Sequence, residues 1–224
     1  MSRYSHSPLS FTGLKTVSLR DRSGKVKIEH FATPPPAAPG LLDSLPKVLA
    51  ADSLRAVVAA LTAAREKKRA IIWGMGGHVI KCGLAPILTH LMDRGYATAF
   101  CTNGSTTIHD FEIAIAGATS EDVESVLPDG RFGSAAETGQ QMNLAIRAGV
   151  DDGLGMGESL GRHLHRIAPE NLREHSLQWQ AYQRNVPFTV HVAVGTDTPH
   201  TLSLIHISEP TRLRRISYAV FCLK

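Results

Sequence analysis

The sequence lacks any long hydrophobic run, and this absence excludes several classes of protein. Its 224 residues contain no stretch of about 18 consecutive apolar residues, the length that a membrane-spanning helix needs. The first part of the chain, residues 1–30, is polar and charged and has no apolar segment typical of a secretory signal. We therefore expect a cytoplasmic protein with no membrane partner.

Cysteine is scarce, which argues against a disulfide framework and a zinc site. The three cysteines are Cys82, Cys101 and Cys222, and none belongs to a CxxC pair. Unpaired cysteines suit a reducing cytosol. His163 and His165 fall on opposite faces of a predicted helix, and no other cysteine or histidine cluster has ligand spacing. No metal site is predicted.

The last part of the chain resembles a translated sequencing adapter. Residues 202–212 match the mosaic end and linker of a transposase-type DNA adapter, and 216–223 match the primer segment that follows an index-sized gap. The alternative is a natural basic tail with a β-like end. We interpret 202–224 as non-native, which makes 1–201 a fragment that lacks its own C-terminus.

The net positive charge is also small when this tail is left out. The tail holds four of the 24 basic residues and one of the 20 acidic residues, so the net charge falls from +4 to +1 without it. A basic surface is the usual electrostatic mark of nucleic-acid binding. No nucleic-acid partner is therefore predicted.

The most informative stretch is 69–112, which has the pattern of a βαβ unit. An apolar strand at 70–73 runs into a glycine turn, and apolar residues then recur at helical spacing from 79 to 92. A second strand follows at 96–101 and ends in a polar turn at 102–107. Two strands joined by a crossover helix should be parallel, and their carboxyl ends should form the ligand site.

The remaining pattern predicts an α/β fold with a parallel sheet. Helices are expected at 52–65, 109–116, 136–148, 158–166 and 171–183, a helix start at 119–122, and a third buried strand at 186–194. Residues 1–40 are expected to form an N-terminal arm with a small hairpin turning at 21–24. Residues 41–201 are expected to form the main domain, which is incomplete if the chain is a fragment.

The first strand-end turn, Gly74-Met75-Gly76-Gly77, has two possible interpretations. It lacks the third glycine of a dinucleotide fingerprint and the Lys-Ser/Thr of a P-loop. Bare backbone N–H groups before a helix still favour an anion. A tight turn that binds nothing is the alternative.

The second strand-end turn carries hydroxyl, amide and acidic side chains. Thr102, Asn103 and Gly104 open it, and His109 and Glu112 follow three residues apart on one helix face. These two residues could act in acid–base catalysis or hold a ribose hydroxyl. Alternatively, acidic side chains in a first helical turn could only stabilise the helix through its dipole.

These motifs together resemble the deoxyhypusine synthase superfamily. The resemblance rests on Gly76-Gly77-His78 through Gly83, on Thr102-Asn103-Gly104, and on His109-Asp110-Phe111-Glu112, and it covers about residues 65–200. The segment from Asn103 through Ile108-His109-Asp110-Phe111-Glu112 is similar also to the related domain of ornithine cyclodeaminase-like enzymes. The resemblance implies a Rossmann-like sheet with helices on both faces.

The resemblance also implies a cofactor, a reaction and an assembly. The expected function is hydride transfer to NAD from an amine or amino-acid substrate, in a homo-oligomer that is a tetramer in this superfamily. By residue match, the cofactor contacts would be Gly76, Gly77, His78, Thr102, Asn103, Gly104 and Asp197, with Asp110 or Glu112 on the ribose. His109 and Glu112 are the best-placed candidates for the catalytic acid–base role. The rival readings are a nucleotide-binding regulatory module without turnover and a structural α/β domain.

Overall fold

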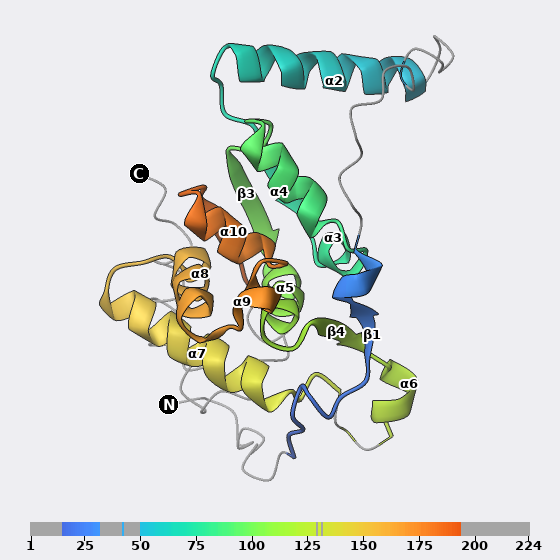
Figure 1. Ribbon diagram of the computed structural model, residues 1–224, viewed down its shortest axis with the longest axis vertical. Coiled ribbons are helices and arrows are strands. Elements are labelled where there is room, and N and C mark those ends of the chain that lie inside the picture. The colour runs from blue at the N-terminus through green and yellow to red at the C-terminus, as the bar shows by residue number, and fades with distance from the viewer. Residues whose placement is uncertain (1–14, 32–41, 43–49, 129, 131, 194–224) are drawn as a thin grey trace, which may run out of the picture.

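A three-stranded parallel sheet forms the centre of the protein (Figure 1). The computed structural model describes residues 15–31, 42, 50–128, 130 and 132–193. The sheet strands are β2 (Ile72–Met75), β3 (Ala99–Asn103) and β5 (Phe188–His191), in the order β2-β3-β5. The α/β fold with a parallel, Rossmann-like sheet is therefore confirmed. Asp197 and the adapter-like tail lie outside the described residues.

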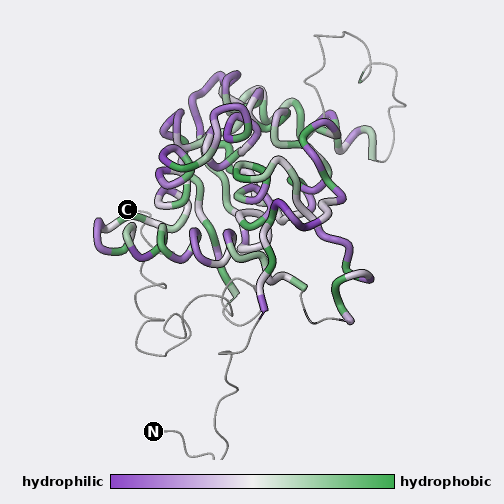
Figure 2. The backbone as a smooth tube through the Cα atoms, turned by 60° about the horizontal axis from the view of Figure 1, so that its bottom comes forward, coloured by the Kyte–Doolittle hydropathy of each residue, from purple (hydrophilic) through white to green (hydrophobic). Residues whose placement is uncertain are grey.

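Helices make up most of the rest of the described chain. The α-helices are α2 (Ala50–Glu66), α3 (His78–Lys81), α4 (Ala85–Asp93), α5 (Gly104–Ala116), α6 (Val123–Val126), α7 (Ala136–Asp151), α8 (Met156–Ile167), α9 (Glu170–Arg173) and α10 (Leu177–Gln183). Hydrophobic and hydrophilic residues alternate along them, as expected for segments with one face toward a core (Figure 2).

The sheet buries one of its two faces. Alternation along β3 and β5 places Phe100, Thr102, Phe188 and Val190 on the buried side. On the other side, the edge residue Ile72 is 64% exposed. The described residues therefore provide a hydrophobic core on one side of the sheet.

The helices that touch the sheet form a single layer. α10 contacts α4, α5 and α8, and α5, α8 and α10 all contact β5. The chain moves in one direction across the sheet, from β2 to β3 to β5, and right-handed crossovers in one direction leave their helices on one face. The second helix layer implied by the resemblance is not found among the described residues.

Two predicted helices are each divided in two. The helix expected over 79–92 breaks at Gly83, which adopts a left-handed φ of 72°, and α4 then starts with Pro86 in its first turn. The helix expected over 171–183 breaks before Ser176, whose hydroxyl accepts a hydrogen bond from Trp179 N and caps α10. Helical periodicity continues across both breaks, so it did not reveal them.

The predicted N-terminal hairpin does not form among the described residues. β1 (Gly24–Lys27) pairs instead with β4 (Ala118–Glu121) in an antiparallel ladder, with Val26 opposite Thr119. The expected helix start at 119–122 is thus a strand, and Ser120 in it has a positive φ of 63°. Residues 15–31 therefore pack into the same unit as the sheet, and this position brings Arg22 into the interior.

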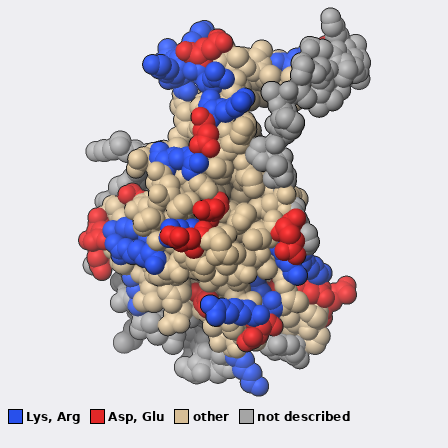
Figure 3. Space-filling view, in the orientation of Figure 1, with Lys and Arg blue, Asp and Glu red and all other residues tan. Residues whose placement is uncertain are grey.

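Helix α2 differs from the other long helices because it has no buried residue. It lies at one end of the molecule, away from the sheet (Figure 1). Exposed Lys67, Lys68 and Arg69 follow its last turn, and basic side chains lie at that end with acidic ones among them, as over the rest of the visible face (Figure 3). No helix in the described part of the chain is long and apolar enough to cross a membrane.

Helix α8 approaches the sheet closely because two of its residues are glycines. A Cβ added at Gly157 would overlap the carbonyl oxygen of Phe188 in β5. A Cβ added at Gly161 would lie 2.6 Å from Tyr182 Cβ in α10. The spacing of four residues places both glycines on one face, so the backbone of α8 packs directly on its neighbours.

We expect Gly157→Ala to lower the free energy of unfolding by about 3 kcal/mol or more, because the added methyl group meets backbone rather than a movable side chain. Glu158→Ala, at the next and exposed position, is the matched control and should change it by less than about 0.5 kcal/mol. Urea unfolding of both variants measures the difference. Equal stabilities would contradict the backbone contact between α8 and β5.

Candidate functional site

The two strand-end turns predicted from the sequence lie side by side. Met75 and Thr102 are paired at the carboxyl ends of β2 and β3. A Cβ placed on Gly76 would lie 3.7 Å from Asn103 Nδ2, and Thr106 Oγ1 lies 3.4 Å from the carbonyl oxygen of Met75. The expected ligand position for a parallel sheet is therefore formed by these turns.

The glycines of the first turn serve different purposes. A Cβ on Gly77 would overlap Ser105 Oγ and would lie 3.0 Å from His109 Cδ2, so Gly77 allows α3 to pack on α5. Gly74 has no atom within 4 Å of its Cβ position, and Gly76 has only the Asn103 amide. The space beside Gly74 and Gly76 is thus open, whereas Gly77 is buried. Gly74 and Met75 belong to β2 and pair with Cys101 and Thr102, so the turn itself begins at Gly76.

Asn103 acts as the N-cap of α5. Its Oδ1 accepts hydrogen bonds from Thr106 N at 3.0 Å and from Thr106 Oγ1 at 2.9 Å. Its side chain remains exposed, and its Nδ2 makes no hydrogen bond with the described residues. Gly104 already begins the helix, so α5 starts five residues before the expected position at His109. The predicted polar turn is largely the first helical turn.

Several polar residues expected to contact a cofactor are instead occupied inside the protein. Thr102 is buried, and its Oγ1 donates to the carbonyl oxygen of Thr189 at 2.9 Å. Asp110 is fully buried at the start of α10, where it accepts from Ser176 Oγ at 2.5 Å and from Leu177 N at 2.7 Å. This geometry does not support the ribose contact that the resemblance implied for Asp110.

Asp110 instead anchors α10 to α5. Its Oδ2 also accepts from Gln178 N at 3.0 Å, so the carboxylate satisfies backbone donors at the helix start. Burial raises the pKa of Asp110 to about 6, and the hydrogen bonds from Ser176 and the α10 backbone oppose that shift. Asp110 is therefore assigned a structural position.

His109 and Glu112 are joined through a residue that the sequence did not single out. His109 Nδ1 lies 2.7 Å from Thr119 Oγ1, and the same hydroxyl donates to Glu112 Oε2 at 2.5 Å. Arg22 Nη2 contacts Glu112 Oε2 at 2.7 Å, and Thr138 Oγ1 donates to Oε1 at 3.2 Å. We name these five residues the histidine relay.

The histidine relay has one reachable end. Glu112 is 3% exposed and all of its contacts are internal, so it lies behind His109. His109 is half-buried, and its Nε2 makes no hydrogen bond with the described residues. Arg22 lies in the turn before β1, in a segment interpreted as a hairpin, and Thr119 lies in β4, which was interpreted as a helix start. Both were missed because no local sequence signal marks them.

The surroundings of His109 favour its neutral form. Burial lowers the pKa of His109 to about 4, and the positive charges of Lys81, Arg22 and His78 add to this shift in that order. Burial raises the pKa of Glu112, whereas Arg22 acts against that shift. The site therefore combines a neutral imidazole with a positively charged neighbourhood, which favours a bound anion.

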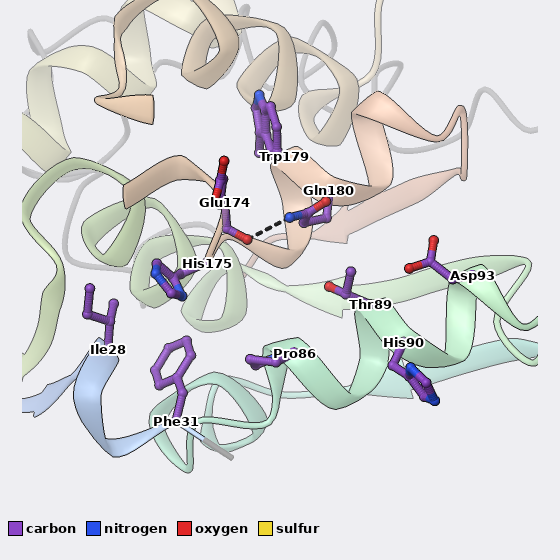
Figure 4. A pocket seen from close by; sticks show the side chains of 10 residues that line it. All are labelled: Ile28, Phe31, Pro86, Thr89, His90, Asp93, Glu174, His175, Trp179 and Gln180. Carbon is purple, nitrogen blue, oxygen red and sulfur yellow. Dashed lines mark hydrogen bonds between the residues drawn. The ribbon is translucent and has the colours of Figure 1, made fainter. Parts of the chain in front are cut away.

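A separate pocket lies between α4 and the α9–α10 segment (Figure 4). Its volume is about 680 Å³, and Phe31, Pro86, Thr89 and His175 are among its lining residues. None of the residues predicted from the sequence to bind cofactor or to act in catalysis lines it. The pocket is therefore distinct from the turns at the sheet edge.

Comparisons with known proteins give no family for this chain. No protein-family model matches it, and no curated protein sequence matches it. A crystal structure of the apo form of ArgZ, an arginine dihydrolase of the ornithine–ammonia cycle in cyanobacteria, is similar with a TM-score of 0.44 and 17% identity. The match covers 78% of this chain and 23% of that one.

The depressed pKa of His109 can be measured directly. We expect its ring signals in NMR to titrate with a midpoint near pH 4 instead of the ordinary 6.5, because burial and neighbouring cations disfavour the imidazolium. The unfolded state then takes up the proton first, so this stabilising contribution is present above pH 6.5 and is lost as the pH falls toward 4. His109→Gln should remove that part of the pH dependence of stability, and a midpoint above 6 would contradict the burial.

Proposed function

We propose that this chain is the NAD-binding part of an enzyme of the deoxyhypusine synthase-like superfamily. Its reaction would be hydride transfer to NAD from an amine or amino-acid substrate, in a cytoplasmic homo-oligomer. The observation that carries the proposal is the open space beside Gly76, where β2 ends next to the start of α5 at the carboxyl edge of the parallel sheet.

The residues at this edge fit a pyrophosphate group. Gly76 leaves room for close approach, and the first N–H groups of α5 follow Asn103 at the adjacent turn. His78 and Asn103 are exposed beside them, and Lys81 contributes a positive charge. These residues would hold the phosphates, whereas Gly77, Gly104, Thr102 and Asp110 would support them from inside the fold.

His109 is the residue proposed to handle the proton. NAD, when bound, would accept the hydride from the carbon that bears the amine. The neutral His109 ring, through its unpartnered Nε2, would accept the proton that leaves the amine nitrogen in the same oxidation. Glu112 would act through Thr119 rather than touch the substrate, because its carboxylate is buried behind His109.

The strongest alternative is a structural α/β domain. What favours it is that Thr102, Asp110 and Glu112 already have internal hydrogen-bond partners and need no ligand. A nucleotide-binding module without turnover is the other alternative. Binding and turnover measured separately distinguish the three.

We expect NAD to bind saturably in calorimetric titration and Gly76→Asp to weaken binding at least about tenfold, or about 1.4 kcal/mol. The new carboxylate would repel the phosphates, and its Cβ has room, so the fold should remain intact. Gly77→Asp is unsuitable because its side chain would collide with Ser105. Ser53→Asp, exposed on α2, adds the same charge elsewhere and should leave binding unchanged.

The outcomes assign the function. No NAD binding by the folded protein would remove the proposal and leave the structural domain. Binding without NADH formation by a longer protein that carries the same 65–200 segment, across a panel of the common amino acids and simple diamines, would favour the regulatory module. An equal loss of affinity in Gly76→Asp and Ser53→Asp would place the nucleotide somewhere other than the sheet edge.

A further inference from the structure

We propose that Thr119, directed by Arg22 and Glu112, is a positioning residue that fixes His109 in the tautomer with its proton on Nδ1. The ring then presents an unprotonated Nε2 as the proton acceptor. The tautomer itself follows from the hydrogen bonds of the described residues. Its catalytic meaning rests on the proposed function.

Arg22 contacts one particular oxygen of Glu112, Oε2. Arg22 Nη2 lies 2.7 Å from Glu112 Oε2, and both side chains are almost completely buried, at 6% and 4% exposure. A guanidinium nitrogen can only donate hydrogen bonds, since arginine stays protonated in proteins. The positive charge at this distance therefore favours the unprotonated form of Glu112 Oε2.

The hydroxyl of Thr119 has a single proton. This hydroxyl lies 2.5 Å from Glu112 Oε2, and an oxygen without a proton can only accept. Thr119 must therefore donate to Glu112. With its proton used, it can only accept from His109 Nδ1 at 2.7 Å, so Nδ1 must carry a proton. The hydrogen bonds thus run in one direction: His109 donates to Thr119, and Thr119 donates to Glu112.

The other ring nitrogen of His109 is Nε2. A neutral imidazole with a proton on Nδ1 has its lone pair on Nε2. The adjacent ring carbon, Cδ2, lies 3.0 Å from the Cβ position of Gly77, so this side of the ring faces the first strand-end turn. The carbon bonded to Nε2 therefore lies next to Gly77.

Arg22 also contacts a second buried carboxylate, and this contact does not change the argument. Arg22 Nη1 lies 3.5 Å from Glu121 Oε1, which accepts from Gly133 N at 2.6 Å. Glu121 Oε2 is buried and has no hydrogen-bond partner in the described part of the chain. The shorter contact is to Glu112, so Arg22 directs the histidine relay through that residue.

The experiment is nitrogen-15 NMR of the histidine rings in the full chain at pH 7, with His109→Gln used to identify the His109 signals. We expect the wild type to show a protonated Nδ1 and an unprotonated Nε2. Thr119→Ser keeps the hydroxyl and should keep this pattern. Thr119→Val has nearly the same shape without a hydroxyl, and the protonated-Nε2 form should rise at least about tenfold relative to the wild type once the Nδ1 acceptor is lost.

The matched control is Thr62→Val on α2, a threonine whose hydroxyl donates to the carbonyl oxygen of Val58 and also interacts with Tyr96. It should leave the His109 signals unchanged. A protonated Nε2 in the wild type would overturn the proposal even if Thr119→Val failed to fold. An unchanged tautomer in folded Thr119→Val would also overturn it, because the hydroxyl would then have no directing role.

Failure of this inference and failure of the proposed function are distinguishable. The tautomer is read in the protein without NAD or substrate. An Nδ1 proton together with no NAD binding would leave the histidine relay in place and remove the enzyme. NAD binding together with an Nε2 proton would keep the cofactor site and remove the role of Thr119.

Discussion

The burial of α5 on almost every side is the constraint on which the rest of the structure depends. A helix that faces a core all round must supply a partner for each of its polar side chains, since an unpartnered buried polar group costs about 1–3 kcal/mol. In α5, Thr107 is bonded to Gln178, Asp110 to the start of α10, and Glu112 to Arg22. These bonds fix the position of α10 and of the N-terminal segment that carries Arg22.

Local pattern predicted the elements that depend on local chemistry. The βαβ unit, its two glycine-bearing turns and the helices over 52–65, 136–148 and 158–166 follow from hydrophobic periodicity and turn residues. The pairing of β1 with β4 could not be predicted, because the partner of Val26 lies more than ninety residues away, at Thr119. Nor does periodicity identify α5 as buried all round, since its stripe describes one face and its other residues are short polar ones.

Within the candidate site, too, the sequence predicts which residues form a motif but not which of them are buried. His109 and Asp110 are neighbours in the sequence, but consecutive residues of a helix point in directions about 100° apart. His109 faces the first turn and β4, whereas Asp110 faces α10 and is fully buried. A motif match assigns a function to both residues together. Only the packing shows that His109 is partly exposed, whereas Asp110 is buried and holds α10.

An ion pair between Arg22 and Glu112 joins the N-terminal segment to the candidate site. Arg22 places a cation within 2.7 Å of Glu112, whose burial alone would favour the neutral acid. The carboxylate in turn sets the direction of the Thr119 hydroxyl, and that hydroxyl sets His109. A residue outside the main α/β unit predicted from the sequence thus takes part in the hydrogen bonds that hold His109. A sequence motif cannot predict this dependence, because the contacts between these residues join segments that are far apart in the sequence.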